Sequence, residues 1–418
     1  MNKKFSGLVA VVALVLVALP LIASCAPAKE APPAAPAAEV KPDAVWMRGS
    51  VAMTGPYAAS LLPALEAAKD AINIVNTERD GIDGVEWKVD ILDDGGDVAK
   101  AIANYEQLRV KEPKCLLFLN ISTSDVAIAL KDRWNEDGVV CWLPSCAPAA
   151  IYPSGNTFSI ITPYADGFGL FCDWLVETQP KPIKLGFCTW DSSMGKSVLT
   201  DECLNYAKQK GIEIVEPPQL YGIMEMDVST QLTNLKNAGA NWVYTNTLGF
   251  GTVVLLKTAA SLGLKDEMHF AGCHFAMDND VNYVAGPAGE GFVGYHNLVT
   301  WYETDNPYVA ERIAAFKAKD LPIEQKAQPY LVFKGWFELE EMIYENAIAE
   351  VGWENLDADA LKNQIYKLKD YDAEVGIFTY SPDKPEPRHA RIVQFKGGKI
   401  LPITDWRVCP DLRPAEYK

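Results

Sequence analysis

The sequence lacks the short motifs that mark many hydrolases, metalloproteases and thiol oxidoreductases, because it contains no HExxH, GxSxG or CxxC. Only four histidines are present, and none lies in a context typical of a catalytic triad. Partial motifs also fail. Gly289–Gly294 fits GxGxxG but precedes a strand-like segment, whereas a dinucleotide-binding motif opens a helix. A possible phosphate loop ending at Ser197 has Trp190 in place of its first glycine. A possible calcium loop starting at Asp278 has Tyr283 in place of its glycine. We therefore predict a protein without enzymatic activity, cofactor or metal.

Basic residues are scarce relative to acidic ones. Lys and Arg total 38 against 55 Asp and Glu, so the formal net charge is −17. Nucleic acids and anionic lipid surfaces are bound by basic patches, so this balance argues against both as direct partners. Hydrophobic residues make up 49% of the chain, which suffices for large cores in more than one domain.

The N-terminus has the pattern of a secretory signal. Lys3 and Lys4 precede an apolar run over residues 8–19, and small residues lead to Cys25, as in a bacterial lipobox. We predict a lipoprotein signal peptide over residues 1–24, with Cys25 lipidated, and an Ala/Pro-rich linker over residues 25–43. An uncleaved membrane anchor is the alternative, although the run is short for a span. The expected location is extracytoplasmic, anchored by lipid to the bacterial membrane.

Nine cysteines are present, and eight remain if Cys25 carries lipid. An even number in an exported protein is compatible with disulfides. However, Cys115, Cys141 and Cys188 lie in apolar strand-like segments, and the spacings show no repeat. We therefore favour buried free thiols, since free cysteine behaves as a small hydrophobic residue.

The stretch from Cys115 to Ala147 predicts a β-α-β unit. An apolar run at residues 115–119 leads through Ser122, Thr123 and Ser124 into an amphipathic helix, and a second apolar run at 139–143 follows. Strands and helices alternate in the same way along the rest of the chain, which predicts an α/β fold with parallel sheets. The pattern restarts after residue 155, so we expect a second lobe of similar size.

In a parallel sheet the two loops of this unit lie side by side at the carboxyl edge, where open α/β sheets bind ligands. Hydroxyls and free backbone N–H groups at a helix start suit a carboxylate. Helix capping alone also explains Ser and Thr at these positions.

An ordered set of segments resembles the leucine/isoleucine/valine-type solute-binding proteins of ABC importers. These segments are Thr54–Ala58, Asp93-Asp94, Ser122–Asp125 and Asp227–Lys236, and the resemblance covers about residues 45 to 405. It implies a type I periplasmic-binding-protein fold, with two Rossmann-like lobes and a ligand cleft between them. It also implies a small-molecule ligand, an ABC permease as partner, hinge closure and a monomer. We expect residues 44–162 and 292–375 in the first lobe, and 163–291 and 376–418 in the second.

The resemblance also implies which residues face the ligand. In the first lobe these are Tyr57, Ser122, Thr123, Ser124, Ser145, Cys146 and Ala147. In the second lobe they are Met194, Asn246, Thr247, His274 and Phe275. His274 is equally explained as a loop histidine with satisfied hydrogen bonds, and for Trp142 and Trp190 we favour core packing.

The second-lobe set departs from the family's usual pattern. Met194 replaces a common tyrosine, and His274 falls where amino-acid binders often carry an acid. A desolvated ammonium without a partner is costly, so we expect a carboxylate or amide ligand with an apolar or aromatic body. Branched-chain amino acids are the second choice. The alternative functions are a sensory module of the same fold and a lipid-anchored hydrolase.

Overall fold

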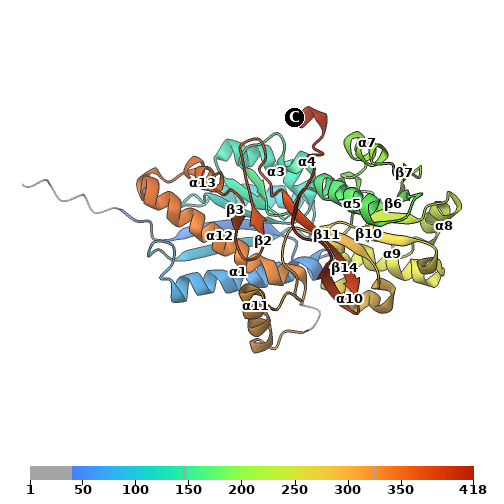
Figure 1. The fold of residues 1–418 in the computed structure, drawn as a ribbon. Helices are drawn as coiled ribbons and strands as arrows, with labels where there is room; N and C mark the ends of the chain where they lie inside the picture. Colours follow the sequence, from blue (N-terminus) through green and yellow to red (C-terminus); the bar gives the residue numbers. More distant parts are fainter. Residues whose placement is uncertain (1–39, 145–146, 323–325) are drawn as a thin grey trace, which may run out of the picture. The chain divides into compact units, whose positions relative to one another are not determined.

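The computed structural model describes residues 40–144, 147–322 and 326–418. The predicted signal peptide, Cys25 and most of the linker lie outside the described residues, as do Ser145 and Cys146. The described chain contains two large sheets, whose strands are connected mainly by helices (Figure 1), and one small two-stranded sheet.

The first sheet has five parallel strands in the order β2-β1-β3-β4-β5. Their bounds are β1 (Val45–Val51), β2 (Trp87–Asp93), β3 (Leu117–Ile121), β4 (Val140–Leu143) and β5 (Thr157–Ser159). β3 is buried along its whole length, as expected for a central parallel strand covered on both faces. Ser50 lies opposite both Leu92 and Asn120, so β1, β2 and β3 end at one edge and their loops are neighbours.

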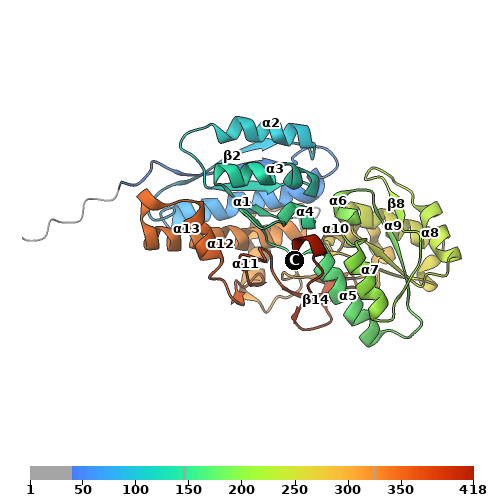
Figure 2. The ribbon, with the colours of Figure 1, turned by 90° about the horizontal axis from the view of Figure 1, so that it is seen from above.

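Helices cover both faces of this sheet (Figure 2). They are α1 (Ala58–Glu78), α2 (Val98–Arg109), α3 (Ser124–Asp137), α4 (Pro148–Ile151), α11 (Pro307–Ala318), α12 (Gln328–Val351) and α13 (Ala358–Ile365). α1 packs along α12 on one face, while α2 and α3 pack together on the other. α3 ends at Gly138, whose φ of 60° gives the left-handed conformation that terminates many helices. We call the sheet with these helices the first lobe.

The second sheet has nine strands and defines the second lobe. Its main order is β15-β14-β11-β10-β9-β6-β7, with β8 paired to β6 and β16 to β14. The strands are β6 (Lys184–Trp190), β7 (Glu213–Ile214), β8 (Gln219–Tyr221), β9 (Trp242–Thr245), β10 (His269–Gly272), β11 (Val293–His296), β14 (His389–Lys396), β15 (Lys399–Pro402) and β16 (Arg407–Val408). The antiparallel β14–β15 pair turns at Gly397 and Gly398.

The connections of the second lobe are mainly helical. They are α5 (Tyr164–Thr178), α6 (Ser193–Lys196), α7 (Asp201–Gln209), α8 (Ser229–Asn237), α9 (Gly249–Ser261), η1 (Leu264–Asp266), η2 (His274–Ala276), α10 (Asn279–Ala285) and η3 (Gly286–Gly289). The remaining short elements are η5 (Trp353–Asn355), β12 (Tyr371–Asp372), β13 (Ile377–Phe378) and η6 (Ala415–Tyr417).

β11 corrects the predicted division of the chain. The expected boundary at residue 292 assigns this strand to the first lobe, but β11 pairs with β10 and β14 in the second sheet. The chain passes between the lobes near residues 160–163, 297–300 and 379–388, and hydrogen bonds tie these crossings together. Asn297 Nδ2 donates to the Ile160 carbonyl at 2.9 Å, and the Tyr380 hydroxyl donates to the Ser159 carbonyl at 2.9 Å.

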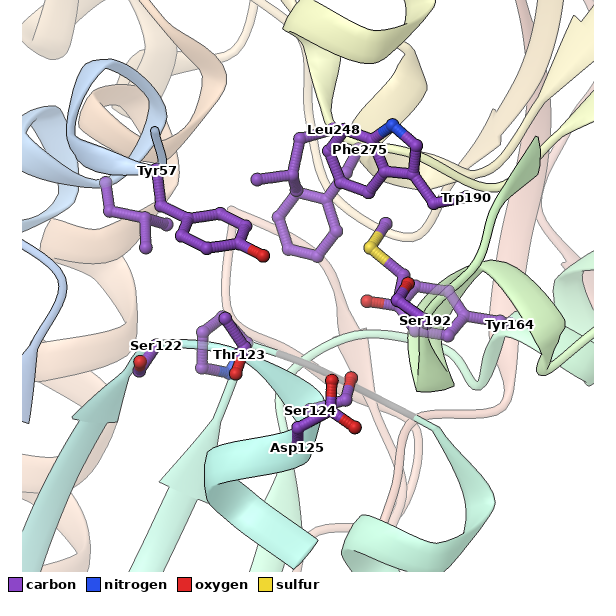
Figure 3. A pocket seen from close by; sticks show the side chains of 13 residues that line it. Tyr57, Ser122, Thr123, Ser124, Asp125, Tyr164, Trp190, Ser192, Leu248 and Phe275 are labelled. Atoms are coloured by element: carbon purple, nitrogen blue, oxygen red, sulfur yellow. The ribbon is translucent and has the colours of Figure 1, made fainter. Parts of the chain in front are cut away.

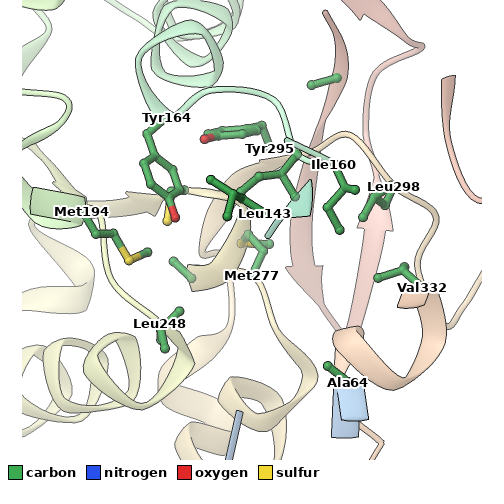
Figure 4. Packing of buried hydrophobic residues seen from close by; sticks show 14 of the residues in the cluster. Ala64, Leu143, Ile160, Tyr164, Met194, Leu248, Met277, Tyr295, Leu298 and Val332 are labelled. Carbon is green, nitrogen blue, oxygen red and sulfur yellow. The ribbon is translucent and has the colours of Figure 1, made fainter. Parts of the chain in front are cut away.

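The buried side chains form one hydrophobic cluster that continues from one lobe to the other. Figure 4 shows this continuity, with Leu143 of the first lobe close to Tyr295 and Met277 of the second. The prediction of buried free thiols is confirmed at seven cysteines, which are Cys115, Cys141, Cys172, Cys188, Cys203, Cys273 and Cys409. Within the described ranges, no helix combines the length and apolar character that a membrane span requires.

Candidate functional site

A cavity lies between the carboxyl ends of the two sheets (Figure 3). The first lobe contributes Tyr57, Leu61, Ser122, Thr123, Ser124, Asp125 and Pro144. The second lobe and the first crossing contribute Tyr164, Trp190, Ser192, Met194, Leu248 and Phe275. Polar groups therefore gather on the first-lobe side, whereas the second-lobe side is mostly apolar.

Two buried or partly buried aspartates fix the loops of the first-lobe side. Asp94 accepts hydrogen bonds from Ser50 Oγ at 2.7 Å and Ser122 Oγ at 3.0 Å. Asp93 accepts from Thr54 Oγ1 at 2.7 Å. Burial raises the pKa of Asp93, but hydrogen bonds from Thr54, Lys100 and neighbouring backbone groups outweigh it and hold this pKa well below the usual range. The Thr54–Ala58 and Asp93-Asp94 motifs thus hold three adjacent loops in place.

Tyr57 is positioned by a close approach to the backbone. Gly96 has φ of +80°, and a Cβ at this residue would lie 2.5 Å from the Tyr57 ring. Glycine is therefore required here both for conformation and for space. Burial, with a smaller effect from Asp125, raises the pKa of Tyr57, so its hydroxyl stays protonated and can donate a hydrogen bond. This hydroxyl points into the cavity in Figure 3.

The start of α3 supplies the strongest polar feature of the cavity. Thr123 caps the helix by accepting from the Val126 N–H at 3.3 Å. The first N–H groups of a helix have no partner within it, and the helix dipole favours negative charge there. Ser124 is 4% exposed, and its hydroxyl has no hydrogen-bond partner among the described residues. A ligand oxygen at this position would satisfy both the hydroxyl and the N–H groups.

The second-lobe wall is built around Trp190. Its indole packs on Gly251, where a Cβ would lie 2.6 Å from the ring, and lies tilted against the Phe250 ring at 4.9 Å between centroids. Leu248, Met194 and Phe275 continue this apolar surface. Such a wall suits the hydrocarbon or aromatic part of a ligand.

Two contacts join the lobes beside the cavity. Ser193 Oγ donates to the Asp125 carboxylate, which links the start of α6 to the start of α3. The Tyr57 and Phe250 rings meet edge to face at 6.4 Å. Residues of both lobes thus line the cavity and meet beside it.

A family model described as periplasmic binding protein matches residues 50–399. The chain belongs to the periplasmic binding protein family. Proteins of this family act outside the cytoplasm and bind small solutes. No curated protein matches the sequence.

Solved structures show the same fold at low sequence identity. A branched-chain amino acid ABC transporter protein from Thermus thermophilus, with bound valine, has a TM-score of 0.78 at 20% identity, covering 90% of this chain and 99% of that one. A fatty acid ABC transporter substrate-binding protein from Thermomonospora curvata has a TM-score of 0.77 at 20% identity, with coverage of 90% and 95%. A solute-binding protein from Rhodopseudomonas palustris HaA2, in complex with p-hydroxybenzoic acid, has a TM-score of 0.76 at 17% identity, with coverage of 90% and 100%.

The structure places part of the predicted set in the lining of the cavity: Tyr57, Ser122, Thr123, Ser124, Met194 and Phe275. The side chains of the three serine and threonine residues in this set differ in their hydrogen bonds. The Ser122 hydroxyl is engaged by Asp94, and the Thr123 hydroxyl caps α3, so Ser124 alone among these three keeps an unpartnered hydroxyl.

Other predicted positions are corrected. Asn246 does not line the cavity, because its amide donates to Ser197 Oγ at 3.0 Å and to the Met194 carbonyl, supporting the α6 turn. Thr247, which precedes α9, is fully buried, and its hydroxyl shares a hydrogen bond with the Thr252 hydroxyl of α9 at 3.0 Å. Ala147 is buried at the start of α4, and His274 lines a separate cavity.

Sequence reasoning missed several lining residues: Leu61, Asp125, Pro144, Tyr164, Trp190, Ser192 and Leu248. Asp125 matters most, because it puts a carboxylate in the cavity. The second-lobe lining contains no acid, as expected, but the first lobe supplies one. The absence of an acid therefore no longer argues against an amino group on the ligand. The aspartate that ends the Ser-Thr-Ser-Asp run could have indicated this carboxylate from the sequence.

Proposed function

We propose that the protein is the solute receptor of an ABC importer and captures a small carboxylate ligand with an apolar body by hinge closure. The observation that carries this proposal is the buried Ser124 hydroxyl at the N-terminus of α3, which has no hydrogen-bond partner among the described residues and lies in a cavity lined by both lobes. The apolar wall at Trp190, Leu248 and Phe275 supports a hydrocarbon or aromatic body.

A branched-chain amino acid is the second candidate ligand, and Asp125 favours it. A carboxylate held at the start of α3 and an ammonium paired with Asp125 would occupy the same side of the cavity. Amides would use the Ser124 hydroxyl through their oxygen. The fatty acid, valine and hydroxybenzoate named for the similar structures all carry a carboxylate, which supports this ligand class.

A ligand that contacts both lobes would stabilise the closed state of the protein. A ligand shifts a hinge equilibrium only by its differential affinity for the closed state. Binding at micromolar affinity corresponds to about 8 kcal/mol, which exceeds a hinge bias of a few kcal/mol. We assign residues 44–159, with 300–378, to the first lobe, and the sheet containing β11 and β14 to the second.

The described lining of the cavity contains no histidine that could act as base beside a nucleophile, and we propose transport rather than hydrolysis as its use. We also propose that the protein is monomeric and is attached to the membrane by lipid on Cys25, with residues 1–24 removed. Titration calorimetry with valine, leucine, 4-hydroxybenzoate, a short fatty acid and their amides tests the ligand class. Binding of at least one acid at micromolar affinity supports the proposal, and binding of sugars or cations in place of every acid contradicts it.

A further inference from the structure

The turn that follows β6 supplies much of the second-lobe wall of the cavity. It covers residues 190–197, includes α6, and is called the α6 turn below. Its cavity-lining residues are Trp190, Ser192 and Met194. Its Ser193 hydroxyl donates to the Asp125 carboxylate of the first lobe. Figure 3 shows Trp190 and Ser192 across the cavity from Tyr57. The position of this one turn therefore affects both the surface that the ligand meets and the contact between the lobes.

The backbone of the α6 turn is folded closely on itself. A Cβ at Gly195 would lie 2.0 Å from the Trp190 carbonyl oxygen, so only glycine fits there. The Gly195 N–H donates to Ser192 Oγ at 3.1 Å, which caps the start of α6. However, α6 has only four residues, and a helix of this length is not stable by itself in water. The α6 turn therefore depends on contacts with the rest of the lobe.

Asn246, which follows β9, makes these contacts from inside the lobe. Its exposed fraction is 0%. Its side-chain nitrogen donates to the Met194 carbonyl at 2.5 Å and to Ser197 Oγ at 3.0 Å. The Ser197 hydroxyl in turn donates to the same Met194 carbonyl at 2.6 Å. Two linked donors thus hold one carbonyl of the α6 turn, and the amide of Asn246 is bonded to both ends of this arrangement.

The backbone of Asn246 is tied to the strand that leads into the turn. Its N–H donates to Thr189 Oγ1 at 3.0 Å. The Thr189 hydroxyl also lies within hydrogen-bond distance of the Asn246 and Gly195 carbonyls, at 3.1 and 3.3 Å. Leu248, two residues after Asn246, lines the ligand cavity. Asn246 therefore connects two of the second-lobe segments that meet at the cavity.

We propose that Asn246 is a positioning residue for ligand recognition, whose amide fixes the α6 turn so that Met194 faces the ligand and Ser193 reaches Asp125. Asn246 acts through the turn, since it does not itself line the cavity. This inference rests on the proposed function, in which the lobes close over an acid. Without the amide, the Met194 carbonyl loses one donor, and the turn is free to adopt positions in which the Ser193 bond is not made.

A double-mutant cycle with Ser193→Ala tests the proposal by calorimetry with valine and with 4-hydroxybenzoate. Asn246→Ala should weaken binding about tenfold, because both the wall and the contact between the lobes are displaced. Ser193→Ala should weaken binding roughly fivefold in the unmodified protein, but should have little further effect in Asn246→Ala. Such non-additivity is expected only if Asn246 positions Ser193.

Asn241→Ala is the matched control. Asn241 immediately precedes β9, at the end of the strand away from the cavity. Its side chain accepts from the Lys184 N–H at 2.8 Å and donates to the Pro182 carbonyl at 2.8 Å. The substitution thus also removes an asparagine that ties β9 to β6, but it leaves the α6 turn in place. Ser193→Ala should therefore keep its fivefold effect in Asn241→Ala.

Ser197→Ala guards against loss of folding in Asn246→Ala. It removes one partner of the amide and leaves the bond from Asn246 to the Met194 carbonyl, so the effect of Ser193→Ala should be reduced but not lost. An equal effect of Ser193→Ala in all four backgrounds would overturn the positioning role and leave the proposed function standing. If no acid of the calorimetric panel binds the unmodified protein, both are overturned.

Discussion

Ser193, at the start of α6, donates a hydrogen bond to the carboxylate of Asp125, at the start of α3, and so links the two lobes beside the cavity. This bond exists only when the lobes are together. Removing it should destabilise the closed state by about 1 kcal/mol, which lowers ligand affinity roughly fivefold. Ser193→Ala should therefore weaken binding without changing the thermal unfolding midpoint of the free protein.

Small-angle scattering checks this effect directly. The radius of gyration should be smaller with ligand than without, and Ser193→Ala should need more ligand to reach the small value. Ser261→Ala, which removes a hydroxyl bonded only within α9, is the matched control. An unchanged radius with a verified ligand bound would rule out hinge closure.

Substituting Asp125 tests whether the ligand carries an amino group. Asp125→Asn keeps the size of the side chain and an acceptor for Ser193, but removes the charge. If the ligand is an amino acid, its affinity should fall about tenfold or more, because a desolvated ammonium loses its partner. Simple acids should bind as well or better, because a like charge is gone. Calorimetry with valine and its deaminated acid measures both.

Gly96 holds Tyr57 in the site, and its substitution has two separable costs. Gly96→Ala strains a backbone at φ +80° and pushes the Tyr57 ring away, whereas Gly398→Ala, at φ +73°, meets nothing within 4 Å. Each should lower stability by about 1 kcal/mol through backbone strain. Only Gly96→Ala should also reduce ligand affinity, by about tenfold. Equal affinities in the two variants would show that Tyr57 does not contact the ligand.

Asp166 should make stability depend on pH. This buried residue of α5 accepts from the Leu412 N–H at 2.8 Å, near Lys384, Glu386, Asp411 and Arg413. Burial is the main cause that raises its pKa from 3.8 to about 7. A raised carboxyl pKa stabilises the fold at low pH, and this contribution is lost as pH rises through roughly 4 to 7.

Asp166→Asn removes this dependence and keeps an acceptor for Leu412. Urea unfolding of this variant should show about 2–4 kcal/mol more stability than the parent at pH 8, and little difference at pH 4. Asp305→Asn, at an exposed position, is the control and should not alter the profile. A parent protein whose stability rises between these pH values would contradict the assignment.

Lipidation is tested by Cys25→Ser. The sequence before Cys25 implies acylation, and each buried CH₂ of an acyl chain contributes about 0.8 kcal/mol to membrane affinity. The variant should move from the membrane fraction to the soluble one, whereas Cys409→Ser, at a buried free thiol, should not. A variant that stays membrane-bound at full length would indicate an ordinary anchor.

Much of the first lobe could be predicted from local pattern. The apolar strand at residues 117–121, the Thr123 cap and the Gly138 end of α3 each follow from short-range rules, and the structure has them. The neighbouring positions of the loops at the sheet edge could also be predicted, because parallel strands end at the same edge of a sheet. The apolar segment near residue 293 was predicted as a strand, but its sheet was not, since strand pairing is non-local.

The second-lobe contacts could not be derived in the same way. Asn246 and Leu248 are two residues apart, yet only Leu248 faces the ligand cavity, because Asn246 turns inward to support the α6 turn. Which side chain faces the ligand depends on how the lobes meet. The position of Tyr164 likewise depends on the crossings, whose packing involves residues more than a hundred positions apart.

The most direct test compares a short acid with its methyl ester in the parent protein and in Ser124→Ala. The ester keeps the apolar body and the shape but cannot carry the charge expected at the start of α3. Calorimetry should show micromolar binding of the acid, at least tenfold weaker binding of the ester, and a smaller difference in Ser124→Ala. Equal affinity for acid and ester in the parent protein would contradict a carboxylate site at Ser124.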